Sequence, residues 1–150
     1  MRESDLAYVA GLFDGDGCIY IKKNLPSALR RMKNPSYEIA VAVANTYPPI
    51  LKELKNWFGG TIKKTKRKKD SHSILYQWGL TSKSALPFLR MVYPYLRIKK
   101  EQVMWALLFE DYRKTLNPRE GRKGYSEEEI ACFELIKLRV QELKKYGSES

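Results

Sequence analysis

The chain has 150 residues, and its 28 lysines and arginines against 17 aspartates and glutamates give a formal net charge of +11. Its hydrophobic fraction of 43% is ordinary for a globular protein. A positive excess of this size favours a polyanionic partner, either nucleic acid or an anionic membrane, over a merely soluble basic protein. No apolar run is long enough to span a bilayer, no N-terminal secretion signal is recognisable, and the two cysteines form no CxxC. We therefore expect an intracellular protein of the cytoplasm, nucleoid or an organelle matrix that is neither secreted nor membrane-bound.

The first expected element is a helix that ends beside an acidic turn. The stretch LAYVAGLFDGDGCIYI has helical spacing of apolar residues in its first half and strand-like alternation in its second half. We expect the helix to begin at Ser4 or Asp5, either of which can serve as the N-cap, and to end at Phe13. The sequence DGDG follows, so two aspartates stand where a helix gives way to a strand.

Four strands are expected next, in two consecutive pairs. The first begins at Cys18, and the second, YEIAVAVANT, follows a loop over residues 25–35. Alternate residues of the second strand are expected to face the core and the opposite side. The inward residues are Ile39, Val41 and Val43, and the outward residues are Glu38, Ala40 and Ala42. The segments TIKKTKRKK and SILYQWGLT predict a hairpin around residues 70–73.

The remaining elements are expected to be helices. A Pro-Pro pair begins a short helix between the two strand pairs, and a Gly-Gly pair ends it. Periodic apolar residues predict helices over residues 83–93 and 99–115. The sequence SEEE at Ser126 predicts a capping box that begins a helix extending to Tyr146. This order predicts an α+β fold with one antiparallel sheet, in which an αββαββα core is followed by extra C-terminal helices.

One face of this sheet is expected to be polar and basic. The run KKTKRKK alone would predict a localisation-like basic patch or a solvated hairpin tip. Polar side chains of the other strands lie on the same face, however, and a two-stranded ribbon fits the major groove of duplex DNA. Duplex DNA is favoured over RNA, because the strand aromatics form no base-stacking platform. The expected DNA-binding residues are Tyr20, Lys22, Asn24, Ser36, Glu38, Thr61, Lys63, Thr65, Arg67 and Gln77.

Three interpretations compete for DGDG. It can be a helix-ending turn, since Asp and Gly are common there. A calcium loop is excluded, because Cys18 and Ile19 occupy positions that need a carboxylate or amide and a glycine. A metal-dependent nuclease site is the third, because a carboxylate at a helix C-terminus costs roughly 0.3–1 kcal/mol against the helix dipole and a divalent cation would offset that.

The helix before DGDG carries a stripe of small residues. Ala7, Gly11 and Gly15 recur at intervals of four, although a glycine inside a helix costs about 1 kcal/mol relative to alanine. Such a stripe allows two helices to approach closely, and the sequence contains no second copy of this stretch. If the partner is the same helix of a second subunit, two Asp16 carboxylates meet near the two-fold axis.

The stretch VAGLFDGDG is similar to the signature of the LAGLIDADG homing endonucleases, and the order of elements resembles that family over about residues 4–115. The resemblance implies a saddle-shaped sheet on DNA and Mg²⁺-dependent cleavage of both strands of a long, near-palindromic target. It implies a homodimer, as in single-motif members. It also implies one endonuclease domain, residues 1–150, with a helical extension over about residues 126–146. Mn²⁺ or Ca²⁺ can take the place of Mg²⁺, with no cleavage expected in Ca²⁺.

The resemblance also assigns roles to individual residues. It makes Asp16 the metal-binding carboxylate, and Gly15 would offer its backbone carbonyl to the metal. VANT places Asn45 where the family contacts metal-bound water. PYLRIKKEQ places Lys99 at the active-site lysine, beside Arg97 and Lys100. Asp14 is expected to be structural. The implied dimer interface consists of Ala7, Ala10, Gly11 and Gly15.

Other functions stay open at this point. A protein of the same fold can be a maturase that assists splicing of intron RNA, or a DNA-binding protein that does not cut. Other nuclease classes fit poorly, because the single histidine, His72, lies in the expected hairpin tip and both ExK sequences lie in expected helices.

Overall fold

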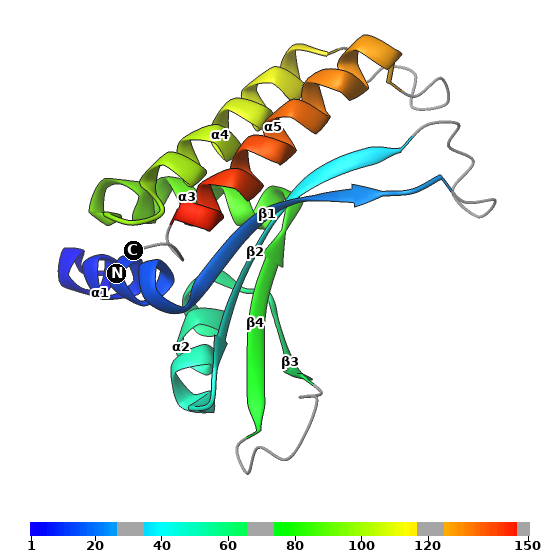
Figure 1. Ribbon diagram of the computed structural model, residues 1–150. Coiled ribbons are helices and arrows are strands. Elements are labelled where there is room, and N and C mark those ends of the chain that lie inside the picture. Colours follow the sequence, from blue (N-terminus) through cyan, green and yellow to red (C-terminus); the bar gives the residue numbers. More distant parts are fainter. Residues whose placement is uncertain (27–34, 66–73, 117–124, 147–150) are drawn as a thin grey trace. The chain divides into compact units, whose positions relative to one another are not determined.

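The computed structural model (Figure 1) describes residues 1–26, 35–65, 74–116 and 125–146, except for the side chains of 145 and 146. Most of the expected loops and the hairpin tip, with Arg67 and His72, lie outside these residues. Among the helices that the structure describes, none combines the length and apolar character needed to cross a membrane.

The order of elements is the predicted one. The elements are α1 (Glu3–Asp16), β1 (Gly17–Asn24), β2 (Ser36–Asn45), α2 (Pro48–Phe58), β3 (Thr61–Thr65), β4 (Leu75–Thr81), α3 (Ala85–Val92), α4 (Lys100–Thr115) and α5 (Glu127–Tyr146), with short 3₁₀ turns on either side of α3. The four strands form one sheet in the order β1-β2-β4-β3, in which β4 pairs antiparallel with both β2 and β3. The α+β prediction is confirmed.

The chain forms two compact units. The first unit contains residues 1–19 and 40–100, and the second contains residues 20–39 and 101–150. The first unit therefore holds α1, α2, α3, β3 and β4, together with residues 17–19 of β1 and 40–45 of β2. The second unit holds α5, nearly all of α4, residues 20–24 of β1 and residues 36–39 of β2.

Helix α1 is longer than predicted at both ends. It begins at Glu3, so Asp5 lies in its first turn, where the carboxylate accepts a hydrogen bond from the Arg2 backbone N–H at 3.1 Å. The expectation that Ser4 or Asp5 is the N-cap is therefore wrong. The helix also continues past Phe13 through DGD, and the N–H of Gly17 donates to the Phe13 carbonyl. A Cβ on Gly17 would collide with Phe13, so this residue ends the helix in a crowded position.

The core of the first unit is built around Phe88 of α3. Its ring meets those of Phe13, Phe58 and Trp78 in edge-to-face contacts, with ring centroids 4.9–5.3 Å apart. The indole N–H of Trp78 donates to the carbonyl of Gly59 at 2.8 Å, which satisfies the one polar atom of that buried side chain. These contacts fix the C-terminal half of α1 against α3 and the sheet.

The alternation predicted for β2 is present, because Val41 and Val43 pair with the buried Leu80 and Trp78, while Ala40 and Ala42 pair with Thr81 and Gly79 on the other face. Ile39, Val41 and Val43 are buried as expected, but Ala40 and Ala42 are buried as well. An alanine methyl in an interior strand is shorter than its neighbours on the flanking strands, so it is covered even on a face that carries polar side chains.

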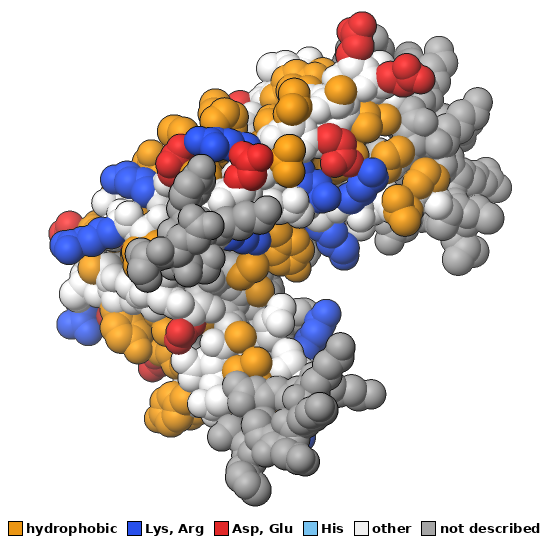
Figure 2. Space-filling model, viewed as in Figure 1, with side chains coloured by type: hydrophobic (Ala, Val, Ile, Leu, Met, Phe, Trp, Pro, Cys, Tyr) orange, Lys and Arg blue, Asp and Glu red, His pale blue; other side chains and the backbone are white. Residues whose placement is uncertain are grey.

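The core of the second unit is built around Phe133 of α5. Its ring packs against Phe109 and Tyr112 of α4, Tyr37 of β2 and Tyr125, with ring centroids 4.9–5.5 Å apart. Helices α4 and α5 lie side by side (Figure 1). Their outer surface keeps apolar side chains exposed between charged ones (Figure 2), and these include Leu108, Leu135 and Leu138.

The predicted capping box of α5 is present. Ser126 Oγ accepts the N–H of Glu129 at 3.1 Å, and the Glu129 carboxylate accepts the N–H of Ser126 at 2.8 Å. These reciprocal bonds satisfy two amide groups that the first turn of a helix leaves without helical partners.

A polar cluster centred on Glu134 ties α5 to the strands of the second unit. Its carboxylate accepts the hydroxyl hydrogen of Tyr37 at 2.6 Å and lies 2.8 Å from the Lys23 ammonium. Hydrogen bonds from Lys23 and Tyr37 lower the pKa of Glu134 below its ordinary value. The hydrogen bond with Glu134 raises the pKa of Lys23.

The Glu134 cluster predicts a stability loss in acid. Because the folded-state pKa of Glu134 is lowered, its contribution is present above the ordinary glutamate pKa and is lost as pH falls through the folded value. E134Q should lower the urea midpoint at pH 7 and flatten its decline between about pH 5 and pH 3, because one titrating carboxylate is gone. Urea titrations monitored by circular dichroism measure this. The control is E142Q, which removes a more exposed partner of Arg139 on the same helix. Equal effects of the two variants would contradict the special role of Glu134.

Candidate active site

The last turn of α1 presents two aspartates in different surroundings. Asp14 is buried, with 8% of its surface exposed, whereas Gly15 and Asp16 are exposed. The last carbonyls of a helix have no partner within the helix, so this turn offers backbone oxygens as well as carboxylates. An acidic pair at a helix C-terminus is unfavourable by itself, and neighbouring donors must compensate for it.

Asn45 lies against Asp16. It is the last residue of β2, and its Nδ2 donates to Asp16 Oδ2 at 3.0 Å. Its own oxygen, Oδ1, accepts the backbone N–H of Tyr47 at 2.8 Å, which fixes the orientation of the amide. The amide therefore presents its NH₂ group to the carboxylate.

Lys99 also reaches the end of α1. Its ammonium nitrogen donates to the carbonyl oxygen of Asp14 at 2.7 Å. The segment before α4 that carries it is hydrogen-bonded to the Asp14 carboxylate through the N–H groups of Arg97, Ile98 and Lys99, at 2.8, 3.2 and 2.9 Å. Three distant parts of the sequence thus meet at one helical turn.

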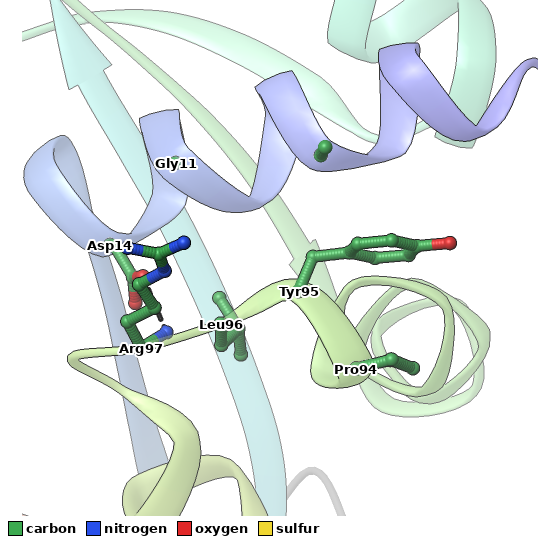
Figure 3. Close-up of a pocket in the computed structure, with 7 residues that line it drawn as sticks. Gly11, Asp14, Pro94, Tyr95, Leu96 and Arg97 are labelled. Atoms are coloured by element: carbon green, nitrogen blue, oxygen red, sulfur yellow. Dashed lines mark hydrogen bonds between the residues drawn. The ribbon is translucent and has the colours of Figure 1, made fainter.

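The side chains of the two basic residues near Lys99 have other surroundings. The Lys100 ammonium lies over the ring of Tyr93, 5.1 Å from its centroid. Arg97 and Asp14 both line a hollow beside α1 (Figure 3). The Lys99 ammonium, by contrast, donates a hydrogen bond to the last turn of α1.

The oxygen donors at this turn suit a Mg²⁺-type ion whose remaining ligands come from water and from the phosphates of a substrate. In the described part of the chain, no three His, Cys, Asp or Glu side chains group into a metal site. The exposed carboxylate of Asp16 and the carbonyl of Gly15 are oxygen donors on the same turn. Mg²⁺ is typically held by one or two carboxylates together with water and substrate phosphates, so these residues fit such an ion.

The stripe of small residues on α1 is open to solvent. Ala7, Gly11 and Gly15 are exposed, and a Cβ added at either glycine would meet no atom within 4 Å. Beside the stripe is a hollow of about 560 Å³ formed by α1 and the segment from Pro94 to Arg97 (Figure 3). Ala10 was expected at the same interface, and this expectation is wrong. Its side chain turns into the core of the first unit, since it lies one position away from the exposed stripe.

The polar strand face is present in the first unit. Lys63 of β3 is paired with Gln77 of β4, and Thr61 lies on the same side of β3, while Ile62 pairs with the buried Trp78 on the opposite side. Thr65 lies on this face too, but its hydroxyl donates to the carbonyl of Leu75 at 3.0 Å.

The polar face of the second unit is linked by local contacts. Glu38 accepts a hydrogen bond from Asn24 at 3.3 Å and lies 3.9 Å from the Lys22 ammonium. Tyr20 lies on the same side of β1, and Lys144 of α5 approaches its ring at 5.6 Å from the centroid. Ser36 begins β2 and is half-buried. The acidic Glu38 thus holds two of the predicted DNA-binding side chains.

Comparison with known proteins identifies the family. A family model described as LAGLIDADG endonuclease matches residues 9–103. The chain therefore belongs to the LAGLIDADG endonuclease family, as its signature implied, and it is a DNA-cleaving nuclease. No curated protein matches the sequence.

Solved homing endonucleases share the fold. The structure of I-CvuI in complex with the I-CreI target in the presence of Mg is 20% identical and has a TM-score of 0.71, covering 94% of this chain and 82% of that chain. I-TnaI is 17% identical, with a TM-score of 0.69 and 96% of each chain covered. The archaeal intron-encoded I-Vdi141I, complexed with DNA, is 9% identical, with a TM-score of 0.67 and 95% and 86% coverage.

The contact between Asp16 and Asn45 predicts an electrostatic effect of N45D. A second carboxylate 3.0 Å from Asp16 replaces a hydrogen bond by like-charge repulsion. The melting temperature at pH 8 in EDTA should fall by several degrees, and the loss should shrink at about 1 M salt, because ions screen repulsion between exposed charges. Differential scanning calorimetry measures both. Q141E, also an amide-to-carboxylate change, lies on the exposed surface of α5 away from its last turn; it is the control and should change the melting temperature little. A loss of melting temperature in N45D that does not change with salt would contradict the prediction.

Proposed function

We propose that this endonuclease acts as a homodimer that cuts both strands of a long, near-palindromic DNA target in a Mg²⁺-dependent reaction. The observation that carries the proposal is the meeting of Asp16, Asn45 and Lys99 at the C-terminal turn of α1. These groups supply an acidic metal ligand, an amide and an ammonium, which together suit hydrolysis of a phosphodiester.

Each residue has a distinct role in this proposal. Asp16 and the Gly15 carbonyl would hold the metal, which when bound supplies water activation and neutralises charge on the phosphate. Asn45, oriented by the Tyr47 N–H, positions a water molecule beside Asp16. Lys99 offsets the negative charge that develops on the phosphate and the leaving oxygen. Mn²⁺ is expected to support cleavage, and Ca²⁺ to support binding alone.

The polar strand faces are the proposed DNA-binding surface. Lys63, Gln77 and Thr61 in the first unit, and Lys22, Asn24 and Tyr20 in the second, combine cations for phosphates with amides that can read base edges. The net charge of +11 supports a large salt-dependent contribution to binding. Target sequence also depends on the deformability of the DNA.

The homodimer rests on the open stripe of α1. Exposed glycines inside a helix lower its stability, so a close helix–helix contact gives them a physical reason. A two-fold contact through this stripe would bring together two copies of Asp16, one for each DNA strand.

We further propose that residues 1–150 form one endonuclease domain that works inside the cell. The backbone passes between the two units at residues 19–20, 39–40 and 100–101, and the strands β1 and β2 contribute to both. Helix α5 is anchored to these strands through Glu134, which supports a structural role for the extension.

The active-site assignment predicts separate losses of cleavage and binding. A cognate site is first selected from a randomised DNA library by cleavage with Mg²⁺. On that site, D16N should lower the single-turnover cleavage rate by at least about 10³-fold, and K99M by about 10²-fold, because each removes charge needed in the transition state. Dissociation constants measured by gel shift in Ca²⁺ should change less than about threefold, because ground-state contacts remain.

Two outcomes decide this proposal. A library with no cleaved sites at any protein concentration would refute the cutting activity, and tight binding of intron RNA under those conditions would favour the maturase alternative. D5N, in the first turn of the same helix, is the matched control and should cleave at the wild-type rate.

The dimer predicts an effect of filling the stripe on α1. G11L places a bulky side chain on the exposed stripe, where an added Cβ meets no atom within 4 Å and a hollow lies beside the helix. Sedimentation equilibrium should then give the mass of one chain for G11L and of two chains for the wild type. The control A131L, on an exposed position of α5, should stay dimeric. A wild-type protein with the mass of one chain would contradict the interface.

A further inference from the structure

The Asp14 carboxylate accepts three hydrogen bonds, and the proposed reaction gives it no role. Its two oxygens accept the backbone N–H groups of Arg97, Ile98 and Lys99, with Oδ2 taking the first and Oδ1 the other two. The side chain is 8% exposed. Figure 3 shows it pointing from α1 towards the segment that precedes α4. A carboxylate this buried needs such donors, since burial without them is strongly unfavourable.

The three N–H groups lie directly before α4, which begins at Lys100. The first N–H groups of a helix lack partners within the helix and attract negative charge. Lys99 stands at the N-cap position and Arg97 and Ile98 come before it, so Asp14 accepts the N–H groups of the segment that leads into α4. This arrangement joins the C-terminal turn of α1 to the beginning of α4.

The contact between Asp14 and Lys99 is reciprocal. The Asp14 carboxylate accepts the Lys99 backbone N–H at 2.9 Å, and the Lys99 ammonium donates back to the Asp14 carbonyl at 2.7 Å. Backbone and side chain of the lysine are thus held by the same aspartate. Asp16, two residues further along α1, is positioned by the same helical turn.

We propose that Asp14 is a positioning residue for cleavage, which sets the place of Lys99 relative to Asp16. The inference rests on the proposed function of that site. Asp14 binds no metal and contacts no substrate in this proposal. It acts through Lys99, because loss of its three hydrogen bonds frees the segment that carries the ammonium. A displacement of a catalytic group by about 1 Å can reduce a rate by about 10²-fold.

The isosteric variant D14N tests this directly. An amide keeps one acceptor oxygen, but it turns an NH₂ group towards backbone N–H donors that it cannot bind. On the selected DNA site, D14N should lower the single-turnover rate in Mg²⁺ by about 10–100-fold, with the Ca²⁺ dissociation constant within about threefold of wild type. Hydrogen exchange should show faster exchange of the amides of residues 97–99, whereas D5N should leave these amides and the rate unchanged.

A double-mutant cycle separates positioning through Lys99 from an independent effect. If Asp14 acts through Lys99, D14N/K99M should cleave within about threefold of K99M alone, because the group to be positioned is already absent. A double mutant slowed by the product of both single effects would overturn the inference. So would a D14N protein that cleaves at the wild-type rate. A wild-type protein that cuts no DNA would instead refute the proposed function.

Folding is checked separately. Thermal melts of D14N should show a cooperative transition above the assay temperature. If D14N does not fold, D14E replaces it, since glutamate keeps the charge and moves the oxygens by one methylene. D14E should then cleave more slowly than wild type with DNA affinity retained, and wild-type cleavage by D14E would contradict the need for a fixed position.

Discussion

The buried carboxylate of Asp14 is the constraint on which the geometry of the site depends. It accepts hydrogen bonds from three backbone N–H groups of the segment that precedes α4. The backbone carbonyl of the same residue accepts a hydrogen bond from the ammonium of Lys99. A charge with so little exposure is tolerated only when donors surround it. The same bonds satisfy the N–H groups of the segment that leads into α4, so one carboxylate fixes that segment against the last turn of α1.

The rest of the first unit holds that turn in place. Phe13 lies one residue before Asp14, and its ring is fixed against Phe88, which also contacts Trp78 of the sheet. Gly17 closes the helix where no larger residue fits, so β1 begins directly after Asp16. Asn45 reaches Asp16 because β2 ends at that position. A rigid core therefore carries an exposed carboxylate, which is the combination that a metal-dependent nuclease requires.

The second unit shows how a sheet can be polar on one face and still be firmly packed. Tyr37 and Lys23 meet Glu134 of α5 on one side of the strands, while Lys22, Asn24 and Glu38 contact one another on the other side. The C-terminal helix is therefore joined to the strands by a polar cluster as well as by the rings around Phe133. Such a cluster fixes one orientation of the helix more specifically than apolar packing alone.

The sequence by itself determined the elements, their order and the family. Periodicity, prolines, glycines and the SEEE box depend on local interactions, so α2, α5 and the α+β order follow from them. It also singled out Asp16, Asn45 and Lys99 as site residues through the resemblance of short motifs. Only the tertiary structure decided what depends on distant neighbours. The length of α1, the burial of Ala10, Ala40 and Ala42, and the three N–H groups that Asp14 receives from residues 97–99 are of this kind. A local pattern records which face a residue prefers, but it does not record which distant donor will lie against it.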